Sequence, residues 1–119
     1  MLDYDEDAEL DRYVWDHHTE RFTEFELQVR RAHQAERKAS GAGEPMARML
    51  RDRSGARGDP DVARALVDGW AAFRFAARSR VMRDHPSEVV VNRCPDCERV
   101  VKTPQARQCL WCGCDWRGR

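Results

Sequence analysis

The sequence contains no isoleucine, one asparagine and two lysines against 19 arginines. It also lacks the run of about 20 apolar residues that a membrane-spanning helix needs. Its first residues are acidic, whereas a secretory signal begins with basic residues followed by an apolar stretch. We therefore expect a cytoplasmic protein with no membrane partner.

The sequence also has no formal net charge at pH 7, because 21 basic side chains balance 21 acidic ones. No global charge therefore directs the chain toward nucleic acid or an acidic membrane. The arginine excess, with so little lysine, isoleucine and asparagine, is typical of a GC-rich coding bias and is no evidence for phosphate binding. A length of 119 residues excludes a large enzyme fold, and the few large aliphatic residues predict a thin core.

The charges are unevenly distributed along the chain. Residues 1–26 have a net charge of −8, and residues 27–119 have a net charge of +8. We expect an acidic first helix that packs against, or is simply offset by, the basic remainder. A second interpretation is an acidic arm that occupies a basic groove until a partner displaces it.

Apolar residues recur every three or four positions over residues 5–40, which predicts one long helix that ends at the glycines that follow. Thr23 and Glu26 also fit a capping box, so two helices are an alternative. The apolar positions are Leu10, Val14, Phe22, Phe25, Val29 and Ala32.

Three further segments follow along the chain. We expect a short helix after Pro45, a linker over residues 54–58 and a second long helix over residues 60–83. This last helix would begin with Asp59 as its cap and Pro60 in its first turn. The predicted fold is mainly α, with two long antiparallel helices and a short one in a helical domain (residues 1–87), before a small C-terminal module (residues 88–119).

All five cysteines lie in that C-terminal module. Four of them form two C-x2-C pairs separated by 11 residues, and extended segments flank the first pair. Two such pairs can bring four thiolates to one zinc ion. The predicted zinc ligands are Cys94, Cys97, Cys109 and Cys112.

This pattern resembles the zinc-ribbon superfamily, over about residues 88–116 and not over the helical part. The resemblance implies two zinc knuckles carried by a small β-hairpin. Gly113 stands where knuckles commonly have glycine, whereas Glu98 occupies the equivalent position of the first knuckle. The ligands follow the family pattern at both knuckles.

Two other chemistries use similar cysteines. A thioredoxin-type redox centre needs a helix and further strands after its cysteine pair, and only 22 residues follow Cys97. An iron site of the rubredoxin kind uses the same four sulfurs and stays open as an alternative. Four sulfurs close the coordination shell, so we expect one structural Zn²⁺ that supplies folding free energy. Cys114 is a fifth thiol, which we interpret as a spare.

No catalytic motif is recognisable, and we expect that the chain is not an enzyme. Acidic residues around His17 and His18 lack the paired Glu-x-x-His pattern of a di-iron site, and His18 fits a boundary histidine on the apolar face. Phosphate-binding glycine loops and serine-nucleophile motifs are also missing from the sequence.

The predicted function is therefore binding. Our first hypothesis is a protein-interaction, adaptor or partner-neutralising protein that uses the acidic first helix, the second long helix or the Trp111 edge. A homodimer that covers Trp70, Phe73 and Phe75 is a further expectation. The alternative is a nucleic-acid-associated regulator that uses the basic surface of residues 27–87. Its basic residues are Arg30, Arg31, Arg37, Lys38, Arg48, Arg51 and Arg53.

Overall fold

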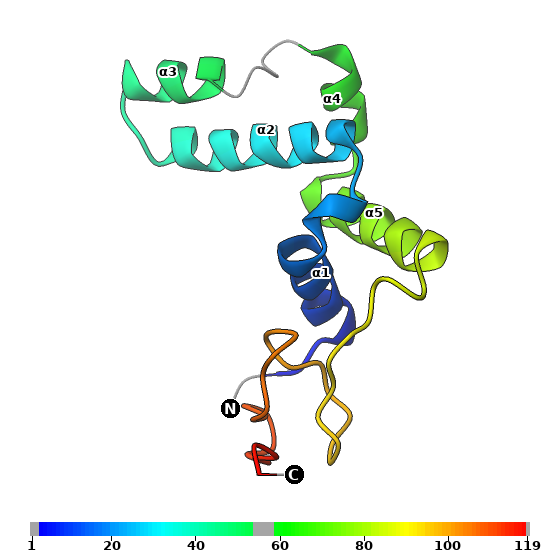
Figure 1. Cartoon of the computed structure of the whole chain (residues 1–119). Coiled ribbons are helices and arrows are strands. Elements are labelled where there is room, and N and C mark those ends of the chain that lie inside the picture. Colours follow the sequence, from blue (N-terminus) through cyan, green and yellow to red (C-terminus); the bar gives the residue numbers. More distant parts are fainter. Residues whose placement is uncertain (1–2, 54–58, 119) are drawn as a thin grey trace. The chain divides into compact units, whose positions relative to one another are not determined.

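The computed structural model describes residues 3–53 and 59–118 and contains five α-helices in these residues (Figure 1). The chain divides into two compact units. One unit combines Met1–Arg21 with Arg78–Arg119, and the other is Phe22–Ala77. The linker predicted over residues 54–58 lies outside the described residues.

The N-terminal region forms two α-helices. Helix α1 spans Glu6–His17 and begins where the Asp5 side chain accepts a hydrogen bond from the backbone N–H of Ala8. A short 3-10 helix, η1 (Thr19–Arg21), follows. Helix α2 (Glu24–Ser40) then begins with a complete capping box, which starts a new helix at this point. The prediction of one helix over residues 5–40 is therefore wrong, and the two-helix alternative is confirmed.

The Phe22–Ala77 unit is built around α2, which contacts both α3 (Met46–Arg53) and α4 (Pro60–Ala65). Val29 from α2 and Val62 from α4 are the buried centre of this unit. The His33 ring stacks on the Trp70 indole with their centroids 5.0 Å apart. Half-buried residues around this centre are Ala32, Ala65, Leu66, Trp70 and Phe73.

The second predicted long helix is also divided in two. Asp59 caps α4 and Pro60 lies in its first turn, as the sequence predicts. The helix then ends at Ala65, and α5 begins only at Trp70 and ends at Asp84. Gly69 lies between them with a φ of 93°, a left-handed conformation that glycine adopts without steric cost. The prediction of two long antiparallel helices is therefore wrong.

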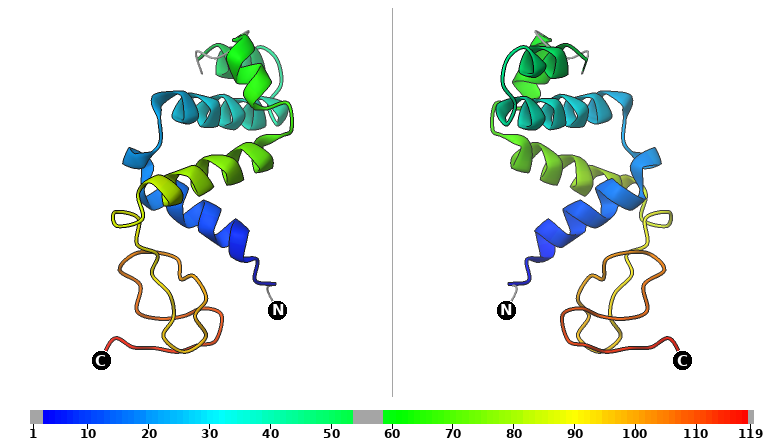
Figure 2. Two further views of the ribbon diagram at one scale, coloured as in Figure 1. Left: turned by 90° about the vertical axis from the view of Figure 1, so that its right-hand side faces the viewer. Right: turned by 90° about the vertical axis from the view of Figure 1, so that its left-hand side faces the viewer.

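The C-terminal module contains no β-strand in its described residues, 88–118, and is drawn as coil after α5 (Figure 2). Only two isolated antiparallel bridges form, Arg93 with Val100 and Gln108 with Asp115. Each bridge closes a cysteine turn, and the intervening chain turns again near Pro104 instead of extending a ladder. The predicted C-terminal β-hairpin is therefore wrong, whereas the mainly α class is correct.

None of the helices in the described ranges has the length and apolar character needed to cross a bilayer.

Candidate metal centre

Four cysteines from the two C-x2-C pairs converge on one point. Their Sγ atoms all lie within 4.8 Å of one another. Sγ of Cys94 is 3.6 Å from that of Cys112, and Sγ of Cys97 is 3.7 Å from that of Cys109. A tetrahedron with metal–sulfur bonds of about 2.3 Å has edges of about 3.8 Å, so these four side chains fit a tetrahedral S4 metal centre.

The two cysteine turns repeat each other at an interval of 15 residues. We call residues 93–100 the first knuckle and residues 108–115 the second knuckle. In the first, the N–H of Cys94 donates to the carbonyl of Arg99 at 3.0 Å; in the second, the N–H of Cys109 donates to that of Cys114 at 2.8 Å. The bridges between the first and last residues of each knuckle follow the same interval. Identical turns therefore place both cysteine pairs.

Backbone N–H groups within each knuckle point at the sulfur of its first cysteine. The N–H groups of Asp96 and Cys97 lie 3.4 and 3.5 Å from Sγ of Cys94. The N–H groups of Trp111 and Cys112 lie 3.3 and 3.4 Å from Sγ of Cys109. Such donors stabilise a thiolate, which is the form of cysteine that binds a metal.

Both knuckles close through a residue in the left-handed conformation. Gly113 has a φ of 82°, and Glu98 has a φ of 62° at the equivalent position. The N–H of each donates to the carbonyl of the first cysteine, at 2.9 Å in both cases. The departure from glycine that the sequence shows at Glu98 therefore leaves the turn intact. The Arg93 guanidinium donates to the Glu98 carbonyl at 2.9 Å and supports this turn.

The thiols perturb one another strongly. Burial raises the pKa of Cys94, but the N–H groups of Cys97 and Asp96 and the neighbouring thiols lower it to about 6. At Cys112, the N–H of Cys114 lowers the pKa, but burial and the adjacent cysteine side chains raise it to about 12. Keeping all four sulfurs deprotonated at this distance therefore requires a cation to offset their repulsion.

Cys114 lies outside the four-sulfur cluster. It is half-buried and packs with the apolar residues around Cys94, Val101 and Cys109. Its backbone carbonyl closes the second knuckle. A structural role in packing therefore agrees with its interpretation as a spare thiol.

Two tyrosines hold the module: Tyr4, just before α1, and Tyr13 within it. The Tyr4 hydroxyl accepts the N–H of Val100 at 2.9 Å, and the Tyr13 hydroxyl accepts the N–H of Asn92 at 3.1 Å. The Tyr4 ring also meets the Trp111 ring edge to face, with centroids 5.0 Å apart. These contacts fix the metal module to α1 and to the residues just before it.

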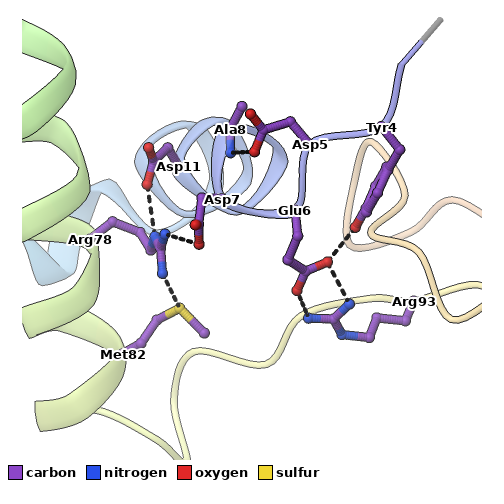
Figure 3. A network of polar contacts seen from close by, with 9 residues as sticks. All are labelled: Tyr4, Asp5, Glu6, Asp7, Ala8, Asp11, Arg78, Met82 and Arg93. Carbon is purple, nitrogen blue, oxygen red and sulfur yellow. Dashed lines mark hydrogen bonds and ion pairs between the residues drawn. The ribbon is translucent and has the colours of Figure 1, made fainter.

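Ion pairs tie α1 both to the metal module and to α5 (Figure 3). The Arg93 guanidinium binds the Glu6 carboxylate with both terminal nitrogens, at 3.2 and 2.6 Å. This hydrogen bond is the main reason why the pKa of Glu6 lies below its usual value. Arg78 of α5 donates to Asp11 at 2.7 Å and to Asp7 at 3.1 Å. The prediction that the acidic first helix packs against basic residues is thus confirmed for these three carboxylates.

Asn92 is a positioning residue that the sequence analysis did not single out. Its side-chain NH₂ lies within hydrogen-bonding distance of three backbone carbonyls, those of Thr103, Pro104 and Ala106, at 3.0, 3.3 and 2.8 Å. Asn92 therefore ties the segment between the two knuckles to the residues just before the first knuckle. Its being the single asparagine of the chain, placed two residues before Cys94, was the available signal.

The other residues that the sequence singled out lie outside the metal centre. On the basic surface, Arg31 pairs with Glu24 at 2.8 Å and Arg51 pairs with Glu36 at 2.9 Å. His18 is half-buried, as predicted for a boundary histidine, with its ring 6.0 Å from that of Tyr13.

No protein-family model, curated protein sequence or solved structure matches this chain. The likeness to zinc ribbons therefore rests on the cysteine pattern alone.

Proposed function

We propose that the chain is a non-enzymatic protein-interaction or adaptor protein in which one structural Zn²⁺ stabilises the C-terminal module. The convergence of four sulfurs, with all four Sγ atoms within 4.8 Å, is the observation that supports it most strongly. Four thiolates complete the coordination of zinc and leave no open position for a substrate or for water. Cys94, Cys97, Cys109 and Cys112 would hold the ion, and its contribution is to folding.

The anchoring of the module supports the same proposal. The first knuckle and the residue before it are held by Tyr4, just before α1, and by Glu6 and Tyr13 of α1. A rigid module presents a fixed surface, and a fixed surface loses little conformational entropy on binding a partner. We infer a cytoplasmic protein that uses this surface to bind or neutralise another protein.

The test is capture of a partner by the tagged full-length protein from the cells that produce it, with and without nuclease. We expect a stoichiometric protein that remains after nuclease treatment. The Cys94→Ser/Cys109→Ser variant, which removes two of the four sulfurs, should not capture it. Recovery of nucleic acid alone, or of proteins that nuclease releases, would refute the adaptor proposal.

A nucleic-acid-associated regulator is the second candidate. Arg37, Lys38 and Gln34 line an open depression of about 270 Å³ on α2, which favours it. The ion pairs of Arg31 and Arg51 weaken it, because paired guanidinium groups contribute less to phosphate binding. This candidate predicts an affinity for oligonucleotides that falls steeply with salt concentration, and an affinity independent of salt would exclude it.

The proposed homodimer has its own test. Trp70 and Phe73 pack against the Val29 and Val62 centre, whereas Phe75 is 44% exposed. Light scattering over a concentration series should show association that a Phe75→Ser substitution weakens. A monomer at every concentration would refute the dimer.

A further inference from the structure

Two adjacent cavities share a wall at the tip of the second knuckle. The first has a volume of about 310 Å³ and the second about 250 Å³. Lys102, Leu110 and Trp111 line both. We call the two cavities together the knuckle groove. All the residues that line it belong to the unit that contains α1 and the metal module.

Leu110 and Trp111 form the apolar part of the shared wall, and the Trp111 ring is held in place. The Trp111 indole N–H donates to the carbonyl of Val100 at 3.2 Å, and Tyr4 packs edge to face against its ring. Leu110 is 68% exposed, which is high for a leucine next to a cavity. A fixed aromatic ring beside an exposed aliphatic side chain is suited to receive one apolar side chain of a partner.

The first cavity is basic. Lys102, Arg107 and Arg117 line it, and none of the described residues that line it carries a carboxylate. The Arg117 guanidinium donates to Asp115 at 3.0 Å, so that its charge is already paired. Among the residues that the structure describes, no ion-pair partner occurs for the side chain of Lys102 or Arg107. Two positive charges are therefore available to a ligand.

The second cavity has acidic residues in its lining, which the first lacks. Asp3 and Glu9 line it, together with Arg12, which is paired with Glu9. A polyphosphate chain that followed the groove would be repelled by Asp3, since Arg12 already offsets the charge of Glu9. A peptide can place acidic side chains at one end of the groove alone. The charges therefore favour a protein segment over a nucleic acid.

We propose that the knuckle groove binds an extended acidic segment of a partner protein. One apolar side chain of the segment would contact Leu110 and Trp111, and aspartate or glutamate residues on one side of it would pair with Lys102 and Arg107. This inference rests on the proposed adaptor function and names the surface and the partner chemistry that it uses.

The test uses a matched set of synthetic peptides and the full-length, zinc-loaded chain. Each fluorescent 11-residue peptide has Leu, Phe, Trp or Ser at its centre, and its preceding residues are all acidic, all Ser or all Lys. Fluorescence anisotropy measures each Kd. We expect acidic peptides with an apolar centre to bind at least about tenfold tighter than the Lys peptides, and the Ser centre to remove this binding.

Matched substitutions locate the surface. Lys102→Glu and Arg107→Glu should each weaken the acidic peptides by about tenfold or more, and Leu110→Ser should weaken all peptides that have an apolar centre. Val90→Ser is the control for Leu110→Ser, because both parent side chains are 68% exposed and Val90 lies outside the groove. Arg83→Glu, on α5, is the control for charge reversal. Lys102→Ala gives a milder change if Lys102→Glu fails to fold, and zinc content verifies each variant.

Several results would overturn the groove proposal. The first is equal affinity for the acidic, Ser and Lys peptides, and the second is an equal effect of Leu110→Ser and Val90→Ser on peptide affinity. The third is binding of a 12-nucleotide oligo(dT) that is tighter than binding of the acidic peptides. The fourth is self-association of the chain that Leu110→Ser removes. Partner capture distinguishes the two proposals. If Leu110→Ser captures the same protein as the wild type, the adaptor proposal stands and the groove is not its surface; if the wild type captures none, the adaptor proposal fails.

Discussion

Replacing Asp11 by alanine removes the carboxylate that lies against a buried guanidinium. The Arg78 Nε atom donates to Oδ1 of Asp11 at 2.7 Å, and the two side chains are only 8% and 6% exposed. In the Asp11→Ala variant, Arg78 keeps its ion pair with Asp7, with Nη2 of Arg78 3.1 Å from Oδ1 of Asp7. The Asp7 side chain is 65% exposed, so this pair is weaker. A charge that loses its partner inside a protein cannot recover its hydration.

The expected loss follows from this burial. Breaking one side of a buried ion pair costs about 3–5 kcal/mol. Because Asp7 keeps part of the interaction, we expect the lower end, about 3 kcal/mol, for Asp11→Ala. Asp7→Ala is the matched control on the same helix, and its exposed carboxylate should contribute less than about 1 kcal/mol.

Urea unfolding of the metal-loaded protein at neutral pH measures these changes. Tryptophan fluorescence reports them, because Trp15 of α1 is 2% exposed in the folded chain and meets water on unfolding. The double variant Asp11→Leu/Arg78→Met replaces both charges by apolar groups and should recover most of the loss. The reasoning is refuted if Asp11→Ala costs less than about 1 kcal/mol, or if the double variant is no more stable than the single one.

Four other substitutions test the metal module and its contacts with α1. Glu98→Gly should stabilise the module and Gly113→Ala should destabilise it, each by roughly 0.5–1 kcal/mol in urea unfolding. A left-handed residue other than glycine costs about 1–2 kcal/mol, and part of this is offset because glycine makes the unfolded chain more flexible. A change of stability in the same direction for both variants would contradict this. Tyr13→Phe should cost about 1–3 kcal/mol, measured in the same way, because it leaves the N–H of Asn92 without its acceptor; a loss within error would contradict it. The pKa of Glu6 is lower in the folded chain than its usual 4.5, so its stabilising contribution is complete above that pH and is lost as the pH falls through the folded value. Glu6→Gln should therefore flatten the acid side of a stability–pH profile, and an unchanged slope would contradict it.

The sequence predicted local features well. The caps at Thr23 and Asp59 were readable because a side-chain acceptor before a helix has a fixed spacing to the N–H groups that it binds. The four cysteines were readable because their spacing reflects the geometry of the turns.

The helix breaks and the shape of the C-terminal module were not predicted, because they depend on competition between neighbouring segments. An apolar repeat continued through residues 19–23 and 66–69, and the periodicity could not show that a capping box or Gly69 interrupts each helix. The extended segments of the module suggested a hairpin, but each forms only one bridge before the chain turns. Long-range contacts, such as that of Tyr4 with Val100, leave no local pattern in the sequence.

The central claim is that four cysteines hold one structural metal ion and that Cys114 does not take part. Metal analysis combined with thiol titration of the native chain tests it most directly. We predict one zinc ion per chain and a single reactive thiol, removed by Cys114→Ser, with all five thiols reactive after chelation and denaturation. Five reactive thiols in the native chain, or a disulfide among the four cysteines, would contradict the account.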